Sequence, residues 1–303
     1  MQIFNDLVPA TEYSAVALGF FDGIHSGHKA VIKQAVKCKK NGLTPTLLTY
    51  SKKPRDVISK GESDYLESNN HKIKQLENVG IERLYIIDFE EIMSLSPQEF
   101  VEKILVEKLK AKKVFCGFNY HFGKGGKATG VELEEICRSY GIKAVVVPPV
   151  IMDGGVVSST RIRHLLNEGN VKEANALLGY KFGIETQVVH GNHIGKGLGF
   201  PTINQQAEKG VMLPKFGVYA SIVTVEGNRY CGVTNVGVKP TVGDYAPLYE
   251  TWMPKYKGDD IYGKTIKVEL VDFIRPEKKF SSFQELKENV IENAQQALEI
   301  VKL

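Results

Sequence analysis

The sequence predicts two domains, an α/β domain with a doubly wound parallel sheet and a second, mainly antiparallel β domain. In the first half, short apolar runs alternate with segments of helical periodicity, which is typical of a parallel sheet covered by helices. After Gly179 the helical segments give way to short runs rich in Val, Thr and Tyr. A chain of 303 residues is also long for one core, because single cores stop growing efficiently near this size. We therefore expect domains at residues 1–180 and 181–303.

The first half contains five expected strands and four expected helices in strict alternation. Ser96, Pro97 and Glu99 favour a helix start, because the serine can cap the helix, the proline suits its first turn and the glutamate can close a capping box. In such sheets ligands bind at the carboxyl ends of the strands, near a topological switch point. The expected strands are Ser14–Phe20, Thr46–Tyr50, Leu84–Phe89, Val114–Phe118 and Lys143–Pro148. The expected helices are His25–Lys40, Asn70–Val79, Pro97–Leu109 and Val131–Tyr140.

The second half is expected to form a small antiparallel barrel that ends in a helix. Val225–Arg229 reads as a hairpin turn between two of its strands. Ser282 and Glu285 form a capping-box pattern that opens an amphipathic stretch reaching about Leu298. The expected strands are Phe182–His190, Val218–Val225, Tyr230–Val236 and Thr265–Phe273.

Composition excludes several functional classes. Lysine and arginine exceed the acidic residues by only four, 39 against 35, which argues against nucleic acid as the main partner. The amino terminus lacks a basic region followed by an apolar core, and Pro148 and Pro149 interrupt the longest apolar stretch, so we expect neither export nor a membrane span. The cysteines are scattered without metal-ligand spacing, which favours reduced thiols in a cytoplasm. They are Cys38, Cys116, Cys137 and Cys231.

Residues Gly19–His28 form a glycine-rich turn between an expected strand and an expected helix. A helix start favours anions, because its first N–H groups are unpaired and the helix dipole is positive there. His25 and His28 are three residues apart, which places both imidazoles on one helical face. Gly23 and Gly27 allow a ligand close to the backbone. The turn therefore predicts a phosphate site.

Residues Val157–Arg163 precede another helical pattern and offer a second phosphate grip. Ser158, Ser159 and Thr160 place hydroxyls at the helix start, and Arg161 and Arg163 follow them. Guanidinium groups match phosphate oxygens in a bidentate manner. Taken alone, the segment is more often an ordinary N-cap followed by solvated arginines. Together with the two histidines it favours attack on the α-phosphate of ATP, where catalysis rests on positioning and charge stabilisation.

An aromatic and glycine-rich loop, Gly117–Gly126, follows the fourth expected strand. Asn119, Tyr120 and Phe122 lie in it, so the loop is suited to holding a planar ring beside the phosphate site. A surface loop whose aromatic side chains pack on the sheet is the alternative.

The second half carries its own cluster at 190–204. Its glycines and lysine can surround phosphates with backbone N–H groups, although the spacing differs from that of a P-loop. In extended chain Thr202 and Asn204 point to one face, where their oxygens suit Mg²⁺. Glu250 stands in a strand-like run, where a carboxylate can take a proton from a substrate hydroxyl, although a solvent-facing strand glutamate is the commoner case. The phosphate-binding candidates of this cluster are Gly191, Gly195, Lys196 and Gly199.

Taken in order along the chain, these motifs resemble the bacterial bifunctional riboflavin kinase/FMN adenylyltransferases, also called FAD synthetases. A further matching motif, Arg275–Phe280, precedes the final helix. The resemblance implies a first domain that transfers AMP from ATP to FMN, giving FAD and pyrophosphate. It implies a second domain, a six-stranded barrel, that phosphorylates riboflavin to FMN with ATP and Mg²⁺. Flavins and ATP are the expected partners.

The resemblance also implies roles for individual residues. His25, His28 and Arg161 would stabilise the transferring phosphate, and Glu250 would be the general base of the kinase. Thr202 and Asn204 would hold the metal. The flavin-binding residues would be Asn119, Tyr120, Phe122 and Arg275. The remaining residues of the ATP site would be Gly19, Phe20, Asp22, Gly23, Gly27, Ser158, Ser159, Thr160 and Arg163.

Three departures from the family pattern leave alternatives open. Thr49–Pro54 differs from the usual Thr-Phe-Asp-Pro stretch, and Ile203 replaces an alanine beside the expected metal site. After Glu250 the family usually continues with Thr-His and then an apolar-acidic strand, whereas this chain has Thr251 followed by Trp252–Lys257. Pro254 has no backbone N–H to donate to a neighbouring strand, so the strand that carries Glu250 is expected to end early or to turn there. One alternative is a monofunctional FMN adenylyltransferase with a degenerate kinase barrel. An alternative of another class is a flavin-sensing regulator or RNA-contacting protein.

Overall fold

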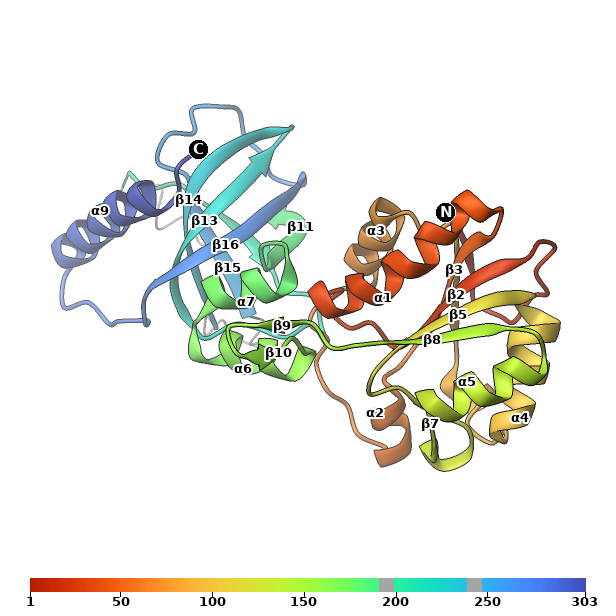
Figure 1. The fold of residues 1–303 in the computed structure, drawn as a ribbon. Helices are drawn as coiled ribbons and strands as arrows, with labels where there is room; N and C mark the ends of the chain where they lie inside the picture. The colour runs from red at the N-terminus through yellow and green to blue at the C-terminus, as the bar shows by residue number, and fades with distance from the viewer. Residues whose placement is uncertain (191–198, 239–246) are drawn as a thin grey trace. The chain divides into compact units, whose positions relative to one another are not determined.

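The computed structural model describes residues 1–190, 199–238 and 247–303, which form two compact units, Met1–Ser159 and Thr160–Leu303. Each unit has its own sheet and its own helices (Figure 1). The first unit is the expected α/β domain and the second contains the expected barrel. Both predicted architectures are confirmed.

The first unit is built on a six-stranded parallel sheet with the order β1-β4-β3-β2-β5-β8. The order runs outward from β2 in both directions, so the carboxyl ends of β2 and β5 flank the topological switch point. All five predicted strands of this half are present. The strands are β1 (Gln2–Phe4), β2 (Ser14–Leu18), β3 (Thr44–Tyr50), β4 (Arg83–Ile87), β5 (Ala111–Gly117) and β8 (Lys143–Val147).

Helices cover both faces of this sheet (Figure 1). Alternate residues of β2 pack against the helices on the two faces of the sheet, because successive side chains of a strand point to opposite faces. Ala15 and Ala17 pack with the buried residues of α1 and α3, whereas Val16 and Leu18 pack with the helices on the other side. The helices are α1 (Ser26–Lys37), α2 (Pro54–Ser59), α3 (Asn69–Val79), α4 (Pro97–Glu99) continued by a helical segment Phe100–Lys108, and α5 (Gly130–Ser139).

Local signals account for the helix starts of the first unit. The capping box predicted at Ser96 is present, since its hydroxyl accepts from the Glu99 N–H and the Glu99 carboxylate accepts from the Ser96 N–H. The edge strand β1 and the short helix α2 were not predicted. Both are short, and β1 is held by pairing with β4 rather than by a pattern of its own. Four two-residue strands also occur: β6 (His121–Phe122), β7 (Ala128–Thr129), β9 (Ile151–Met152) and β10 (Gly155–Val156).

The second unit contains a closed antiparallel barrel with the strand order β11-β12-β15-β14-β13-β16. The predicted hairpin joins β13 to β14, and Glu226 and Gly227 have the positive φ angles, 49° and 83°, that a two-residue turn of this kind requires. The strands are β11 (Gly183–Val189), β12 (Thr202–Gln206), β13 (Gly217–Val225), β14 (Asn228–Val238), β15 (Pro247–Trp252) and β16 (Thr265–Arg275).

Helices complete the second unit. α9 (Phe283–Ile300) packs Ala294 and Ala297 against barrel residues that include Val218 and Val233. Ser282 caps α9 as predicted, but the Glu285 carboxylate accepts from the N–H of Ser281 rather than from that of Ser282.

α6 (Ser159–Glu168) and α7 (Val171–Leu178) connect the chain into the barrel. The Asn175 side chain of α7 donates to the Leu270 carbonyl at 2.9 Å and accepts from the Phe182 N–H at 2.7 Å. This packing groups 160–180 with the second unit, whereas the sequence prediction assigned them to the first domain.

Candidate functional site

The predicted phosphate turn Gly19–His28 links the end of β2 to the start of α1 at the switch point of the sheet. Its backbone is unusual, because Phe21 and Ile24 have positive φ angles of 54° and 29° although neither is glycine. Gly23 has a φ of 86°, and a Cβ there would lie 2.8 Å from Leu66 Cδ1. Such conformations persist only where the surroundings fix them, and they concentrate at functional sites.

His25 and His28 form a stacked pair at the start of α1. Their ring centroids are 3.6 Å apart with an interplanar angle of 17°. His25 is the N-cap residue, and its Nδ1 accepts from the His28 backbone N–H at 3.2 Å. Because Nδ1 of His25 is an acceptor here, a neutral ring carries its proton on Nε2, where it is a hydrogen-bond donor. The pair therefore combines a donor with the anion-binding end of a helix.

Both imidazoles are neutral near pH 7. Burial, with a smaller contribution from the charge of Lys29, lowers the pKa of His25 to about 4. Burial also holds the pKa of His28 well below its ordinary value, and His25 and Lys72 lower it further. A neutral imidazole carries no net charge but can still donate a hydrogen bond.

A buried charged network fixes the turn against the start of α3. The Asp22 carboxylate accepts from the Leu66 N–H at 2.8 Å, and Glu67 accepts from the Gly23 N–H at 3.0 Å. Lys72 Nζ donates to the Phe20 carbonyl at 2.6 Å and to the Thr49 hydroxyl at 3.1 Å. Sequence patterns do not point to Glu67 or Lys72, because these residues meet the turn only through tertiary packing. The network makes the turn rigid.

The serine part of the second predicted clamp meets the turn directly. Ser159 Oγ donates to the Asp22 carbonyl at 2.9 Å, and a Cβ on Gly27 would lie 3.4 Å from the Val157 carbonyl. The structure thus brings Val157 and Ser159 beside the histidine turn. Thr160, Arg161 and Arg163 belong to the second unit, and both arginines are half-buried.

The predicted flavin-side loop follows β5, the other strand at the switch point. Asn119 is exposed and its Oδ1 lies over Gly117. Tyr120 is half-buried and stacks on Phe122 with centroids 6.0 Å apart. Phe122 itself is 6% exposed and packs against Phe100, so its ring belongs to the hydrophobic core rather than to an open ligand surface. Of the three predicted residues only Asn119 is exposed, because the Tyr120 side chain also packs against the core and its hydroxyl is buried.

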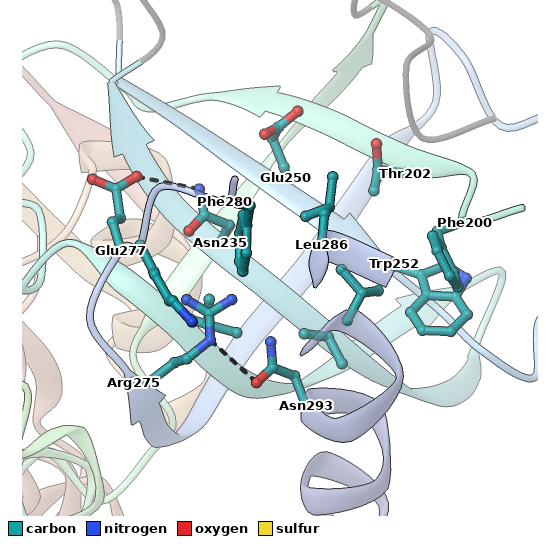
Figure 2. Close-up of a pocket in the computed structure, with 14 residues that line it drawn as sticks. Phe200, Thr202, Asn235, Glu250, Trp252, Arg275, Glu277, Phe280, Leu286 and Asn293 are labelled. Carbon is teal, nitrogen blue, oxygen red and sulfur yellow. Dashed lines mark hydrogen bonds between the residues drawn. The ribbon is translucent and has the colours of Figure 1, made fainter. Parts of the chain in front are cut away.

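The second unit contains a pocket of about 330 Å³ that Glu250 and Thr202 line together with aromatic residues and residues of α9 (Figure 2). Two hydrogen bonds hold its polar wall: Asn235 Nδ2 donates to Glu277 Oε1 at 3.4 Å, and Arg275 Nε donates to Asn293 Oδ1 at 3.3 Å. The lining residues are Phe200, Thr202, Val218, Val233, Asn235, Glu250, Trp252, Arg275, Glu277, Lys278, Phe280, Leu286, Val290 and Asn293.

Strand register brings the predicted kinase residues together. Glu250 of β15 pairs with Asn204 of β12 on one side and with Asn235 of β14 on the other. Asn204 is 5% exposed, and its Oδ1 has no hydrogen-bond partner among the described residues. β15 ends at Trp252, so Pro254 lies beyond the ladder and removes no hydrogen bond from it. The strand that carries Glu250 is intact.

Of the predicted phosphate-binding residues of the barrel domain, the structure describes only Gly199. Gly191, Gly195 and Lys196 lie outside the described residues. Gly199 is exposed, with a positive φ of 85°. Among the residues that the structure describes, no group of three or more His, Cys, Asp or Glu side chains is arranged to hold a metal ion.

A doubly wound sheet with a helix start at its switch point defines a nucleotide-binding domain, here followed by a barrel with a carboxylate-bearing pocket. The family model described as FAD synthetase matches residues 8–161, and the model described as riboflavin kinase matches residues 178–301. The chain belongs to the family of bifunctional riboflavin kinase/FMN adenylyltransferases, which confirms the resemblance that its motifs show.

Curated relatives extend along nearly the whole chain. A bifunctional riboflavin kinase/FMN adenylyltransferase of Bacillus subtilis is 34% identical over 94% of this chain and 92% of its own length. The Listeria monocytogenes protein of that name is also 34% identical, over 89% of this chain and 87% of its own. The Escherichia coli protein is 30% identical, over 92% and 90%.

The fold is also similar to that of a solved structure along nearly the whole chain. A Streptococcus pneumoniae protein, whose structure is described as that of a macrolide-efflux protein, superposes with a TM-score of 0.88 at 30% identity and covers 98% of both chains. In the part of this chain that the structure describes, we find no helix long and apolar enough to cross a membrane.

Proposed function

We propose that this protein makes FAD from riboflavin in two ATP-dependent steps. The barrel phosphorylates riboflavin to FMN, and the α/β domain transfers AMP from ATP to FMN. The observation that carries the proposal is the presence of two separate sites of fitting chemistry: a histidine pair at a helix start and a carboxylate in an apolar pocket. Matches to both family models along the chain support it.

In the adenylyl transfer, an oxygen of the FMN phosphate attacks the α-phosphorus of ATP. The bond from that phosphorus to its bridging oxygen breaks, and pyrophosphate leaves. The Nε2–H of His25 and the N–H groups at the start of α1 donate hydrogen bonds to the oxygens on which charge accumulates. His28 holds the stack and lies on the same side of the helix start. The neutral pair suits this role, because it stabilises charge without trapping the pyrophosphate product in a strong ion pair.

Other residues of the α/β domain position the two substrates. Ser158 and Ser159 add hydroxyls beside the turn, and Arg161 and Arg163 are the guanidinium donors that we assign to the ATP phosphates. Asn119 and Tyr120, at the end of β5, are assigned to the flavin side. Gly27 leaves room at the turn, where a side chain would meet the His25 ring at 3.1 Å.

In the kinase reaction, Glu250 accepts the proton of the terminal hydroxyl of riboflavin while that oxygen attacks the γ-phosphorus of ATP. The bond to the β,γ-bridging oxygen breaks, and ADP leaves. Glu250 fits this role because its carboxylate lines a largely apolar pocket, where it can accept a proton from a bound hydroxyl. The exposed Glu277 binds Asn235 and closes the polar side of the pocket.

Thr202 and Asn204 are the residues that we assign to Mg²⁺ in the kinase site. The fit rests on the buried Oδ1 of Asn204, which has no partner among the described residues and is an oxygen ligand of the kind that Mg²⁺ prefers. When bound, the ion would neutralise charge on the ATP phosphates. We also propose a cytoplasmic location, which suits an ATP-dependent enzyme whose four cysteines are free and buried.

The test is to supply the full chain with riboflavin, ATP and Mg²⁺ and to identify the products over time. The proposal predicts that FMN appears first and FAD follows, and that FMN supplied alone with ATP gives FAD and pyrophosphate. FAD formation from FMN without any FMN formation from riboflavin would establish the monofunctional alternative.

A further inference from the structure

The barrel pocket has an aromatic wall made by Trp252 and Phe200. The two rings meet edge to face, with centroids 4.8 Å apart and an interplanar angle of 70° (Figure 2). Trp252 is half-buried and also packs against the cluster that joins α9 to the barrel. Contacts on several sides fix the indole in one orientation, so the wall is formed before a ligand arrives.

Strand geometry places this wall and the assigned base on the same surface. Glu250 and Trp252 are two residues apart in β15, so both side chains point out of the barrel into the pocket. Thr251 between them points inward, where it is fully buried and its hydroxyl lies 2.8 Å from that of Thr234. The spacing of Glu250 and Trp252 along the strand is about 7 Å.

The opposite side of the pocket has a different character. Phe280 lies there, near Arg275 (Figure 2). Two cations approach its ring centroid, the Arg275 guanidinium at 5.5 Å and the Lys278 ammonium at 5.6 Å. The pocket thus presents an uncharged aromatic wall at Trp252 and a cationic aromatic wall at Phe280. A flat heteroaromatic ring with one apolar edge and one carbonyl-bearing edge matches this asymmetry.

We propose that Trp252 is a specificity-determining residue of the riboflavin site, which selects the flat fused ring and holds it with its hydroxylated tail toward Glu250. The inference rests on the proposed kinase activity and adds the residue that recognises the fused ring of riboflavin. Energy for this selection comes from contact between two extended aromatic surfaces, which an aliphatic side chain of similar volume does not provide.

The first test compares Trp252→Leu with Trp252→Phe in the full chain. Leucine keeps the wall apolar but removes its aromatic plane, whereas phenylalanine keeps a plane. We expect Trp252→Leu to raise the KM for riboflavin about tenfold with a much smaller change in kcat, and Trp252→Phe to restore most of the affinity. Phe283→Leu is the matched control, because Phe283 is a 70% exposed ring on α9 that does not line the pocket.

A second measurement separates ring recognition from a merely structural role. Lumichrome, the flavin ring without its tail, should inhibit the kinase. Trp252→Leu should raise the inhibition constant of lumichrome by the same factor as the KM for riboflavin. Glu250→Gln should abolish turnover and leave lumichrome binding unchanged. A riboflavin KM raised without weaker lumichrome binding would overturn the proposal, and so would an unchanged KM.

A third readout keeps this inference distinct from the kinase proposal. Trp252 is the only tryptophan of the chain, so its fluorescence reports on this pocket alone. Bound lumichrome should protect Trp252 from quenching by acrylamide. Acrylamide quenches by direct contact rather than by energy transfer, so protection means that the ligand covers the indole. If the wild type forms no FMN, the kinase proposal fails, and protection of Trp252 still decides whether the wall binds the ring. Absence of protection at saturating lumichrome would refute the inference itself.

Discussion

His25 accepts the backbone N–H of His28 through Nδ1 at 3.2 Å, while the two rings stack with centroids 3.6 Å apart. One contact therefore does two things: it caps α1, and it fixes the tautomer that leaves Nε2–H free to donate. The His25 side chain therefore both stabilises the start of α1 and supplies the hydrogen-bond donor of the proposed adenylyl transfer.

The first prediction concerns His28. His28→Ala removes one half of the stack and should lower FAD formation from FMN at least tenfold, about 1.4 kcal/mol of barrier, without unfolding the chain. The measurement is the rate of FAD formation at saturating FMN and ATP, with circular dichroism to confirm folding. His164→Ala is the matched control, because that histidine is 70% exposed on α6. Wild-type rates for the His28 variant would remove the histidine pair from the mechanism.

The second prediction concerns stability against pH. The pKa of His25 is lowered to about 4 by burial, whereas in the unfolded chain it lies near 6.5. Between these values the unfolded chain binds more protons, so the free energy of unfolding should fall as pH falls from about 6.5 to about 4, by up to about 1.4 kcal/mol per pH unit. His25→Asn keeps a capping oxygen without this titration and should flatten the slope. Denaturant unfolding across this pH range checks the prediction, and an equal slope in both proteins would contradict it.

The third prediction uses two glycines as a matched pair. Gly23 and Gly42 have positive φ angles of 86° and 75°, but a Cβ at Gly42 meets nothing within 4 Å, whereas one at Gly23 meets Leu66. Gly42→Ala should cost roughly 1 kcal/mol of stability and leave FAD formation unchanged. Gly23→Ala should cost more and slow FAD formation by roughly tenfold, because it displaces the turn that we assign to the ATP phosphates. Equal effects of the two changes on activity would show that the shape of the turn is not critical.

The fourth prediction separates stability from function at Asn204. Its buried Oδ1 has no partner among the described residues, a situation that costs about 1–3 kcal/mol. Asn204→Leu should therefore keep or raise the melting temperature while lowering FMN formation at least tenfold. The dependence of the residual rate on Mg²⁺ concentration is the second readout. A marked loss of stability would mean that Asn204 supports the fold rather than the ion.

Sequence reasoning worked best where a local pattern decides the structure. Five strands of the sheet and the caps at Ser96 and Ser282 follow from periodicity and capping chemistry within a few residues. The edge strand β1 was missed because its three residues carry no period and owe their conformation to β4.

The candidate sites were predictable only in part. His25, His28 and Glu250 stand in motifs that can be read along the chain. The contacts of Lys72 and Trp252 cannot be read from such motifs, because their partners lie in distant segments. Lys72 binds the Phe20 carbonyl, and the Trp252 ring packs against Phe200. Phe122 illustrates a further limit, since an aromatic residue in a glycine-rich loop suggests a ligand contact, whereas only the structure shows that its ring packs against Phe100.

The central claim is that one chain carries two separate active sites, and product analysis of two variants tests it most directly. Given riboflavin, ATP and Mg²⁺, His28→Ala should accumulate FMN and form little FAD. Glu250→Gln should form no FMN from riboflavin but convert supplied FMN to FAD at the wild-type rate. Loss of both reactions in either variant, or of neither, would contradict the account.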